Sequence, residues 1–162
     1  MATQRGDSKE RTAWSALNLP EFFGLDGLDG LDDLVAAVES SRATSIEIVE
    51  FRGIFPEDGL FGIWLSTGFG DFILHAPTAS ELHRRQIVLH ELAHMILGHD
   101  LAAGQSSAAA LFPDLPEAAV LRTLARGHTD NAMEREAEAL ADLLASSLRR
   151  NSRHSSFVRV FG

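Results

Sequence analysis

The chain has 162 residues, 45% of them hydrophobic, and a formal net charge of −9. This length and composition predict a single globular domain with one core. The excess of acidic residues argues against direct binding to nucleic acid or to an anionic membrane, so we expect protein partners. Cysteine is absent, which excludes disulfides and thiolate ligands and leaves histidines and carboxylates as candidate metal ligands.

The first 20 residues are polar and mixed in charge, which is typical of a flexible leader. They have no apolar stretch like that of a signal peptide, and no segment of the chain reaches the roughly 20 apolar residues of a membrane span. We therefore expect a cytoplasmic protein with a leader at 1–20, one folded domain at 21–150 and a C-terminal tail at 151–162.

A helix is predicted to end near Ser40, because Leu28, Leu31, Val35 and Val38 follow one another at helical spacing. Three segments with strand character come next, at 45–51, 60–67 and 71–76, separated by turn signals. Because the connections are short, we expect an antiparallel three-stranded sheet. The third strand lies just before the next helix, and we expect an extended substrate to pair with its edge.

That next helix is predicted over 78–98. Thr78 and Glu81 have the spacing of a capping box, and Gly98 is a suitable C-terminal stop. Its second half is apolar on nearly every side, which indicates a helix buried in the core. Two histidines and a glutamate in such a helix need a specific role, because unpaired polar groups are costly to bury.

Two helices are expected near the C-terminus, one at 115–126 and one from 129 or 130 to about 150. The second has an apolar stripe formed by Leu140, Leu143, Leu144 and Leu148. For the tail, both disorder and a short strand remain open. Together these elements predict an α+β fold in which the small antiparallel sheet packs against the buried helix and the C-terminal helices.

The buried helix contains the motif His-Glu-x-x-His at residues 90–94. His90 and His94 are four residues apart and project from the same face, so both can bind one metal ion. Glu91 lies about 100 degrees further round the helix, where it can reach a metal-bound water and serve as a general base. We therefore predict a site for one zinc ion with Glu91 as the catalytic base.

A catalytic zinc usually has three protein ligands and one open position. A third histidine in the pattern HExxHxxGxxH is excluded, because Gly98 and His99 are each one residue out of register. The alternative is a glutamate from the last helix. Glu134 and Glu138 share a helix face, whereas Glu136 points about 200 degrees away from Glu134.

We assign Glu134 as the third ligand and Glu138 as the carboxylate that accepts the remaining ring proton of His90 or His94. The reverse assignment, with Glu138 on the metal, remains open. The small side chain of Ala137 on the same side would let the two helices approach closely.

The segments LHELAHMILGH and EREAEALADLL resemble the ImmA/IrrE family of metallopeptidases. The resemblance covers about residues 45–146 and implies a zincin-like domain at 21–150 whose third zinc ligand is a glutamate. Glu138 stands where the family pattern has Asn or Asp. Characterised members are linked to cleavage of helix-turn-helix repressors, so the resemblance implies a DNA-binding regulator as the protein substrate and a part in transcription regulation.

The predicted activity is hydrolysis of a peptide bond by a zinc endopeptidase. Candidates for stabilising the oxyanion or contacting the substrate are His75 and His128. We expect His83 on a solvated helix face, His99 at a helix end and His154 in the tail. A second hypothesis is a metal-stabilised interaction module that binds or sequesters a regulator without cleaving it, but the intact Glu91 favours the enzyme, because a structural zinc site needs no base.

Overall fold

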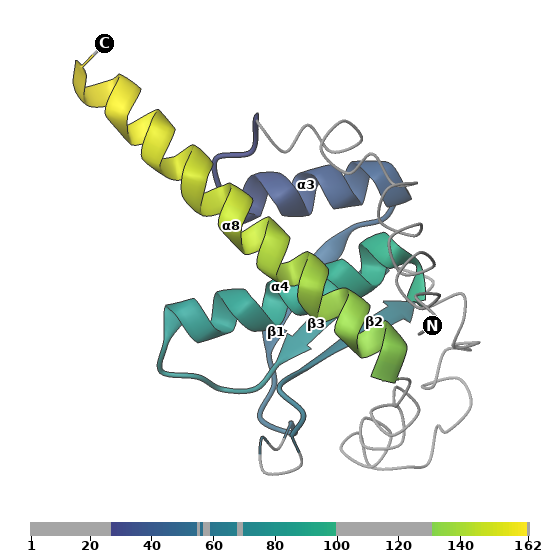
Figure 1. The fold of residues 1–162 in the computed structure, drawn as a ribbon. Coiled ribbons are helices and arrows are strands. Elements are labelled where there is room, and N and C mark those ends of the chain that lie inside the picture. Colours follow the sequence, from purple (N-terminus) through teal and green to yellow (C-terminus); the bar gives the residue numbers. More distant parts are fainter. Residues whose placement is uncertain (1–26, 55, 57–58, 68–69, 100–130, 162) are drawn as a thin grey trace, which may run out of the picture.

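The computed structural model describes residues 27–54, 56, 59–67, 70–99 and 131–161 (Figure 1). In chain order these residues form α3 (Leu31–Arg42), β1 (Ile46–Glu50), β2 (Gly62–Thr67), β3 (Gly70–His75), α4 (Glu81–Leu97) and α8 (Asn131–Phe161). The predicted α+β class is confirmed. The expected leader at 1–20 and the helix at 115–126 lie outside the described residues.

The sheet has the strand order β1-β3-β2, in which β1 is parallel to β3 and β2 is antiparallel to it. The prediction of a wholly antiparallel sheet is therefore wrong. The expectation that a substrate pairs with β3 is also wrong, because β3 is bonded on both sides. β3 is the most deeply buried of the strands and includes buried Ile73 and Leu74, which explains its central position.

The two faces of the sheet belong to different hydrophobic clusters. Trp64 and Ile73 lie in the main core with α3, α4 and α8, and Ile46 and Ile48 pack against it. On the other face is a smaller cluster formed by Ile54, Ile63, Leu74 and Ala76. The alternation of side chains along each strand thus presents one face of the sheet to α4.

Helix α4 lies between the sheet and α8, and its central segment is buried as predicted. Its N-cap is Ser80, whose hydroxyl accepts a hydrogen bond from the backbone N–H of His83 at 3.3 Å. The helix therefore begins later than the predicted Thr78, which instead accepts a bond from the Ser80 N–H. Gly98 ends the helix as expected, in the left-handed conformation with φ of 68°.

Helix α8 crosses α4 and continues past α3, so residues 151–161 are helical rather than disordered or in a strand (Figure 1). Ala137 is fully buried against α4 in the main core, which supports the predicted close approach of these helices. The predicted stripe is confirmed for Leu140, Leu144 and Leu148. It is wrong for Leu143, whose exposed fraction is 43%.

Helix α3 fixes the C-terminal end of α4. Leu34 and Val38 are buried in the main core, and Leu28, Leu31 and Val35 are partly buried against it. Arg42, in the last turn, donates a 2.8 Å hydrogen bond to the carbonyl of Met95, and its guanidinium lies over the Trp64 ring. These contacts hold the turn of α4 that contains His94. None of the helices in the described ranges is long and apolar enough to cross a membrane.

Candidate metal centre

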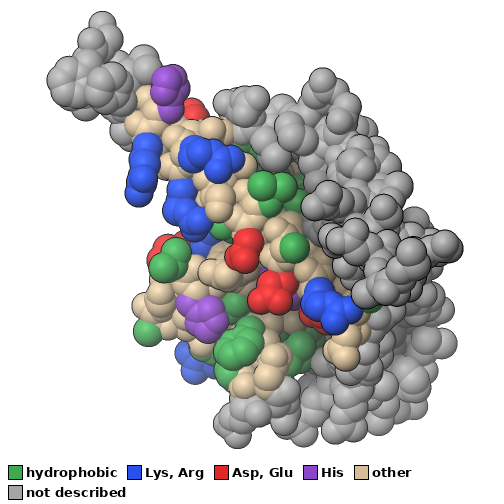
Figure 2. Space-filling model, in the orientation of Figure 1, with side chains coloured by type: hydrophobic (Ala, Val, Ile, Leu, Met, Phe, Trp, Pro, Cys, Tyr) green, Lys and Arg blue, Asp and Glu red, His purple; other side chains and the backbone are tan. Residues whose placement is uncertain are grey.

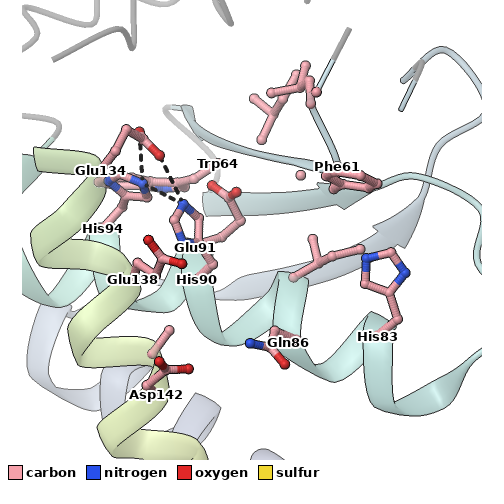
Figure 3. A pocket seen from close by; sticks show the side chains of 16 residues that line it. Phe61, Trp64, His83, Gln86, His90, Glu91, His94, Glu134, Glu138 and Asp142 are labelled. Atoms are coloured by element: carbon pink, nitrogen blue, oxygen red, sulfur yellow. Dashed lines mark hydrogen bonds and ion pairs between the residues drawn. The ribbon is translucent and has the colours of Figure 1, made fainter. Parts of the chain in front are cut away.

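His90 and His94 lie one helical turn apart on α4 and present their Nε2 atoms to the same point, 3.1 Å from each other (Figure 3). His94 is buried and His90 is partly exposed. This arrangement follows from the four-residue spacing, which places both rings on the face of α4 that meets α8.

Glu134, in the first turn of α8, completes the group. Its Oε2 is 3.2 Å from Nε2 of His90, and its Oε1 is 3.3 Å from Nε2 of His94. One ligand atom from each of the three residues lies within 4.8 Å of the others, so the group could hold a metal ion. The structure therefore brings together the three side chains predicted as ligands.

Charge within this group changes the acidity of two members. Burial would raise the pKa of Glu134, but hydrogen bonds from His90 and His94 outweigh it and hold that pKa well below the usual value. Burial would likewise lower the pKa of His90, but the hydrogen bond to Glu134 and the charge of Glu91 raise it above its usual value. Both shifts favour an ion pair between protonated His90 and ionised Glu134. A metal cation bound here would take the place of the proton on His90.

Glu91 is buried beside the three-donor group without belonging to it (Figure 3). Burial raises the pKa of its carboxyl, while the charges of His90 and His94 and a hydrogen bond from the backbone of Trp64 oppose the rise. Glu91 therefore binds a proton more readily than an exposed glutamate does. The position is the one predicted for a base next to the ligand group.

These residues line a cavity of about 380 Å³ between α4, α8 and β2. The β2 side is formed by residues 59–64, the α4 side includes His83 and Gln86, and the α8 side includes Glu138 and Asp142 (Figure 3). His83 is exposed, as expected, and its ring also lies edge-to-face with the ring of Phe61 at 5.2 Å between centroids. The positions of His83 and Gln86 at the cavity were not predicted from the sequence.

Glu138 lines the cavity, and its charge contributes to the raised pKa of His90. However, Nδ1 of His94 lies 2.7 Å from Nδ1 of His99, and Nε2 of His99 lies 3.5 Å from the carboxylate of Glu136. Nδ1 of His94 therefore meets His99 instead of Glu138, and the role of Glu138 as an acceptor for His90 stays a prediction. Burial and the charge of His94 lower the pKa of His99, which favours its neutral form.

Of the two histidines suggested for the oxyanion or substrate, His75 is buried in β3. Its Nδ1 is 2.9 Å from the carbonyl of Ala76, and it is not among the residues that line the cavity. The structure therefore does not bring His75 to the candidate site. His128 lies outside the described residues.

The fold and this site define a class: an α+β protein with a His/His/Glu group that could hold a metal ion, beside a buried glutamate in a cavity. No protein-family model, curated protein or solved structure matches the chain.

Proposed function

We propose that the protein is a zinc-dependent endopeptidase that cleaves a peptide bond in a regulatory protein. The observation that carries the proposal is the position of Glu91 at the wall of one cavity, next to three converging donors from His90, His94 and Glu134. A site that only stabilised the fold would have no use for an additional buried carboxyl at this place.

The donor set favours zinc. Ligands about 2.0–2.1 Å from a tetrahedral zinc lie about 3.3 Å from one another. Nε2 of His90 lies 3.1 Å from Nε2 of His94 and 3.2 Å from Oε2 of Glu134, and Nε2 of His94 lies 3.3 Å from the other carboxylate oxygen, Oε1. Two imidazole nitrogens and one carboxylate oxygen are a ligand set of catalytic zinc sites, in which the fourth position is left for water or substrate.

When bound, zinc would supply a Lewis acid that polarises the peptide carbonyl and makes water more acidic. The chain's own contribution is proton transfer by Glu91. Glu91 is buried next to the donor group, where it can take a proton from water and pass it to the leaving amine. The hydrogen bond from the Trp64 backbone fixes the carboxylate for this task.

Strand β2 is the best candidate for binding the substrate backbone. It stands at one end of the strand order and forms one side of the cavity. An extended peptide could hydrogen-bond to this edge as an additional strand, with its side chains alternating toward and away from the cavity. This arrangement would bring a peptide bond close to Glu91.

Charge favours a basic protein as the substrate. The chain has a net charge of −9, and Glu138 and Asp142 add carboxylates to the α8 side of the cavity. Figure 2 shows acidic side chains near the centre of one face and basic ones along the C-terminal half of α8. DNA-binding regulators are commonly basic, and the resemblance to the ImmA/IrrE family favours a helix-turn-helix regulator.

The test compares the zinc-loaded protein with Glu91→Gln on a peptide library prepared from a whole proteome, with new termini identified by mass spectrometry. We expect recurrent cleavage by the original protein, none by Glu91→Gln, and one equivalent of zinc in both. Glu81→Gln, at an exposed position on the same helix, is the matched control and should cleave normally. Equal cleavage by Glu91→Gln would contradict the proposal, and zinc binding without cleavage by any variant would favour the interaction module.

A further inference from the structure

We propose that His99 and Glu136 form a hydrogen-bonded relay that holds His94 in the orientation and tautomer needed to bind a metal ion. Both would be positioning residues that act through His94. The inference rests on the metal site of the proposed function, and it assigns a purpose to two side chains that the proposed reaction does not use.

The three side chains form a continuous line from α4 to α8. Nδ1 of His94 meets Nδ1 of His99 at 2.7 Å, which is a short hydrogen-bond distance. Nε2 of His99 lies 3.5 Å from Oε2 of Glu136. Both imidazole side chains are less than 10% exposed, whereas Glu136 is partly exposed at the outer end. The contact between the histidines is therefore shielded from water.

Hydrogen-bond chemistry then determines where the protons lie. Nε2 of His94 faces Glu134 and His90, so with a metal bound to this group the nitrogen must carry the lone pair that binds the ion. A neutral imidazole with a lone pair on Nε2 has its proton on Nδ1. The Nδ1–H of His94 then donates a hydrogen bond to Nδ1 of His99, which must be unprotonated because two N–H groups cannot face each other at this distance. His99 consequently carries its own proton on Nε2, which faces the Glu136 carboxylate.

This assignment gives the His94–His99 contact and the His99–Glu136 contact one donor and one acceptor each, and the negative charge of Glu136 favours the proton on Nε2 of His99. Metal-bound histidines usually donate their second ring N–H to an acceptor that fixes the ring and raises its basicity. Here the acceptor is another imidazole, which a carboxylate holds in the accepting tautomer. Glu134 and Glu136, two residues apart, thus act on opposite nitrogens of His94, one directly and one through His99.

The backbone explains how His99 reaches this position. A residue five positions after His94 would lie well round the helix from it in a continuous helix. Gly98 instead has φ of 68°, and this left-handed turn brings the next side chain back against His94. The close approach of α4 and α8 around buried Ala137 brings Glu136 within reach of His99.

The test measures the zinc affinity of the full chain by competition with a chromophoric chelator, and the visible spectrum of the Co²⁺-loaded protein. We expect His99→Phe, which removes both nitrogens, to weaken zinc binding by about 10- to 100-fold and to change the Co²⁺ spectrum. His99→Asn should restore most of the affinity, because its amide oxygen can accept a hydrogen bond where Nδ1 stood. Glu136→Gln should weaken binding by about tenfold.

Glu81→Gln is the matched control for Glu136→Gln, since both remove the charge of an ion-paired glutamate, and it should leave zinc affinity unchanged. Imidazole ¹⁵N NMR of the original zinc-loaded protein provides a measurement without substitutions. We expect the Nδ1–H tautomer for His94 and the Nε2–H tautomer for His99. The opposite tautomer of His99, or unchanged zinc affinity and Co²⁺ spectrum in His99→Phe, would overturn the relay.

The two proposals can fail separately. If the original protein binds zinc and cleaves peptides while His99→Phe binds zinc equally well, the relay fails and the endopeptidase stands. If zinc affinity depends on His99 but no peptide is cleaved, the relay stands and the endopeptidase fails. If the original protein binds no zinc, the metal site and the relay both fail.

Discussion

Gly62 on β2 lies directly against Glu91 on α4. A Cβ atom added to Gly62 would stand 2.8 Å from Oε1 of Glu91 and 2.6 Å from Cγ2 of Ile87. Both distances are shorter than ordinary van der Waals contact, so the strand can approach the helix this closely only because residue 62 has no side chain. The position of the proposed base therefore depends on a glycine in a different element.

Gly62→Ala should consequently impair catalysis more than metal binding. The new methyl group would displace the Glu91 carboxylate, and small misplacements of catalytic groups can cost on the order of 100-fold in rate. We expect kcat/KM to fall by at least about tenfold while one zinc remains bound. Gly27→Ala, where an added Cβ meets nothing within 4 Å, is the control. Full activity in Gly62→Ala would show that the approach of β2 does not position Glu91.

The two candidate third ligands can be separated by matched substitutions. Glu134→Gln removes a carboxylate that contacts both His90 and His94, so we expect zinc affinity to fall by more than about 100-fold, beyond the usual effect of an outer partner. Glu138→Gln alters the acceptor predicted for His90 and leaves the three donors in place, so it should cost about 10- to 100-fold at most. Chelator competition measures both effects, and the reverse order of affinities would assign Glu138 as the ligand.

The stability of the metal-free protein should fall on both sides of mildly acidic pH. The lowered pKa of Glu134 gives stability that is present above its ordinary value of 4.5 and is lost as pH falls through the folded value. The raised pKa of His90 gives stability that is present below 6.5 and is lost as pH rises through the folded value. The raised pKa of Glu91 adds a loss as pH rises above 4.5, because a buried carboxylate must then ionise.

Urea unfolding of the protein in chelator, followed as a function of pH, measures this dependence. We expect Glu91→Gln to lose less stability than the original protein as pH rises above 4.5, and Glu134→Gln to lose less as pH falls below 4.5. A midpoint that responds to pH in the same way in both variants and in the original protein would contradict the electrostatic account.

The crossing of α4 and α8 should tolerate no larger side chain at Ala137, which is fully buried there. Ala137→Leu would push the helices apart and cost about 1–3 kcal/mol of the free energy of unfolding, as overpacking usually does. It should also weaken zinc binding, because Glu134 comes from α8 and the histidines from α4. Ala139→Leu, at an exposed position of α8, should change neither property. Normal zinc affinity in Ala137→Leu would mean that the site does not depend on this contact.

Sequence spacing alone was enough to identify the side chains that share one helix. His90, Glu91 and His94 could be placed because the geometry of a helix is local, and the apolar surroundings of the motif showed that its helix is buried. The same reasoning limited the candidates for the third donor to Glu134 and Glu138, which share one face of the last helix. The structure brings Glu134 to the two histidines.

Contacts between elements were beyond that reasoning. The parallel pairing of β1 with β3, the His99–Glu136 contact and the closeness of Gly62 to Glu91 join residues whose spacing along the chain carries no information about their distance in space. They depend on which strand is buried most deeply, on the left-handed turn at Gly98 and on how closely α8 packs on α4. Residue spacing within one helix determines which side chains of the motif share a face. Packing between helices and strands decides which residues surround the motif, because the core is formed by segments that are far apart in the sequence.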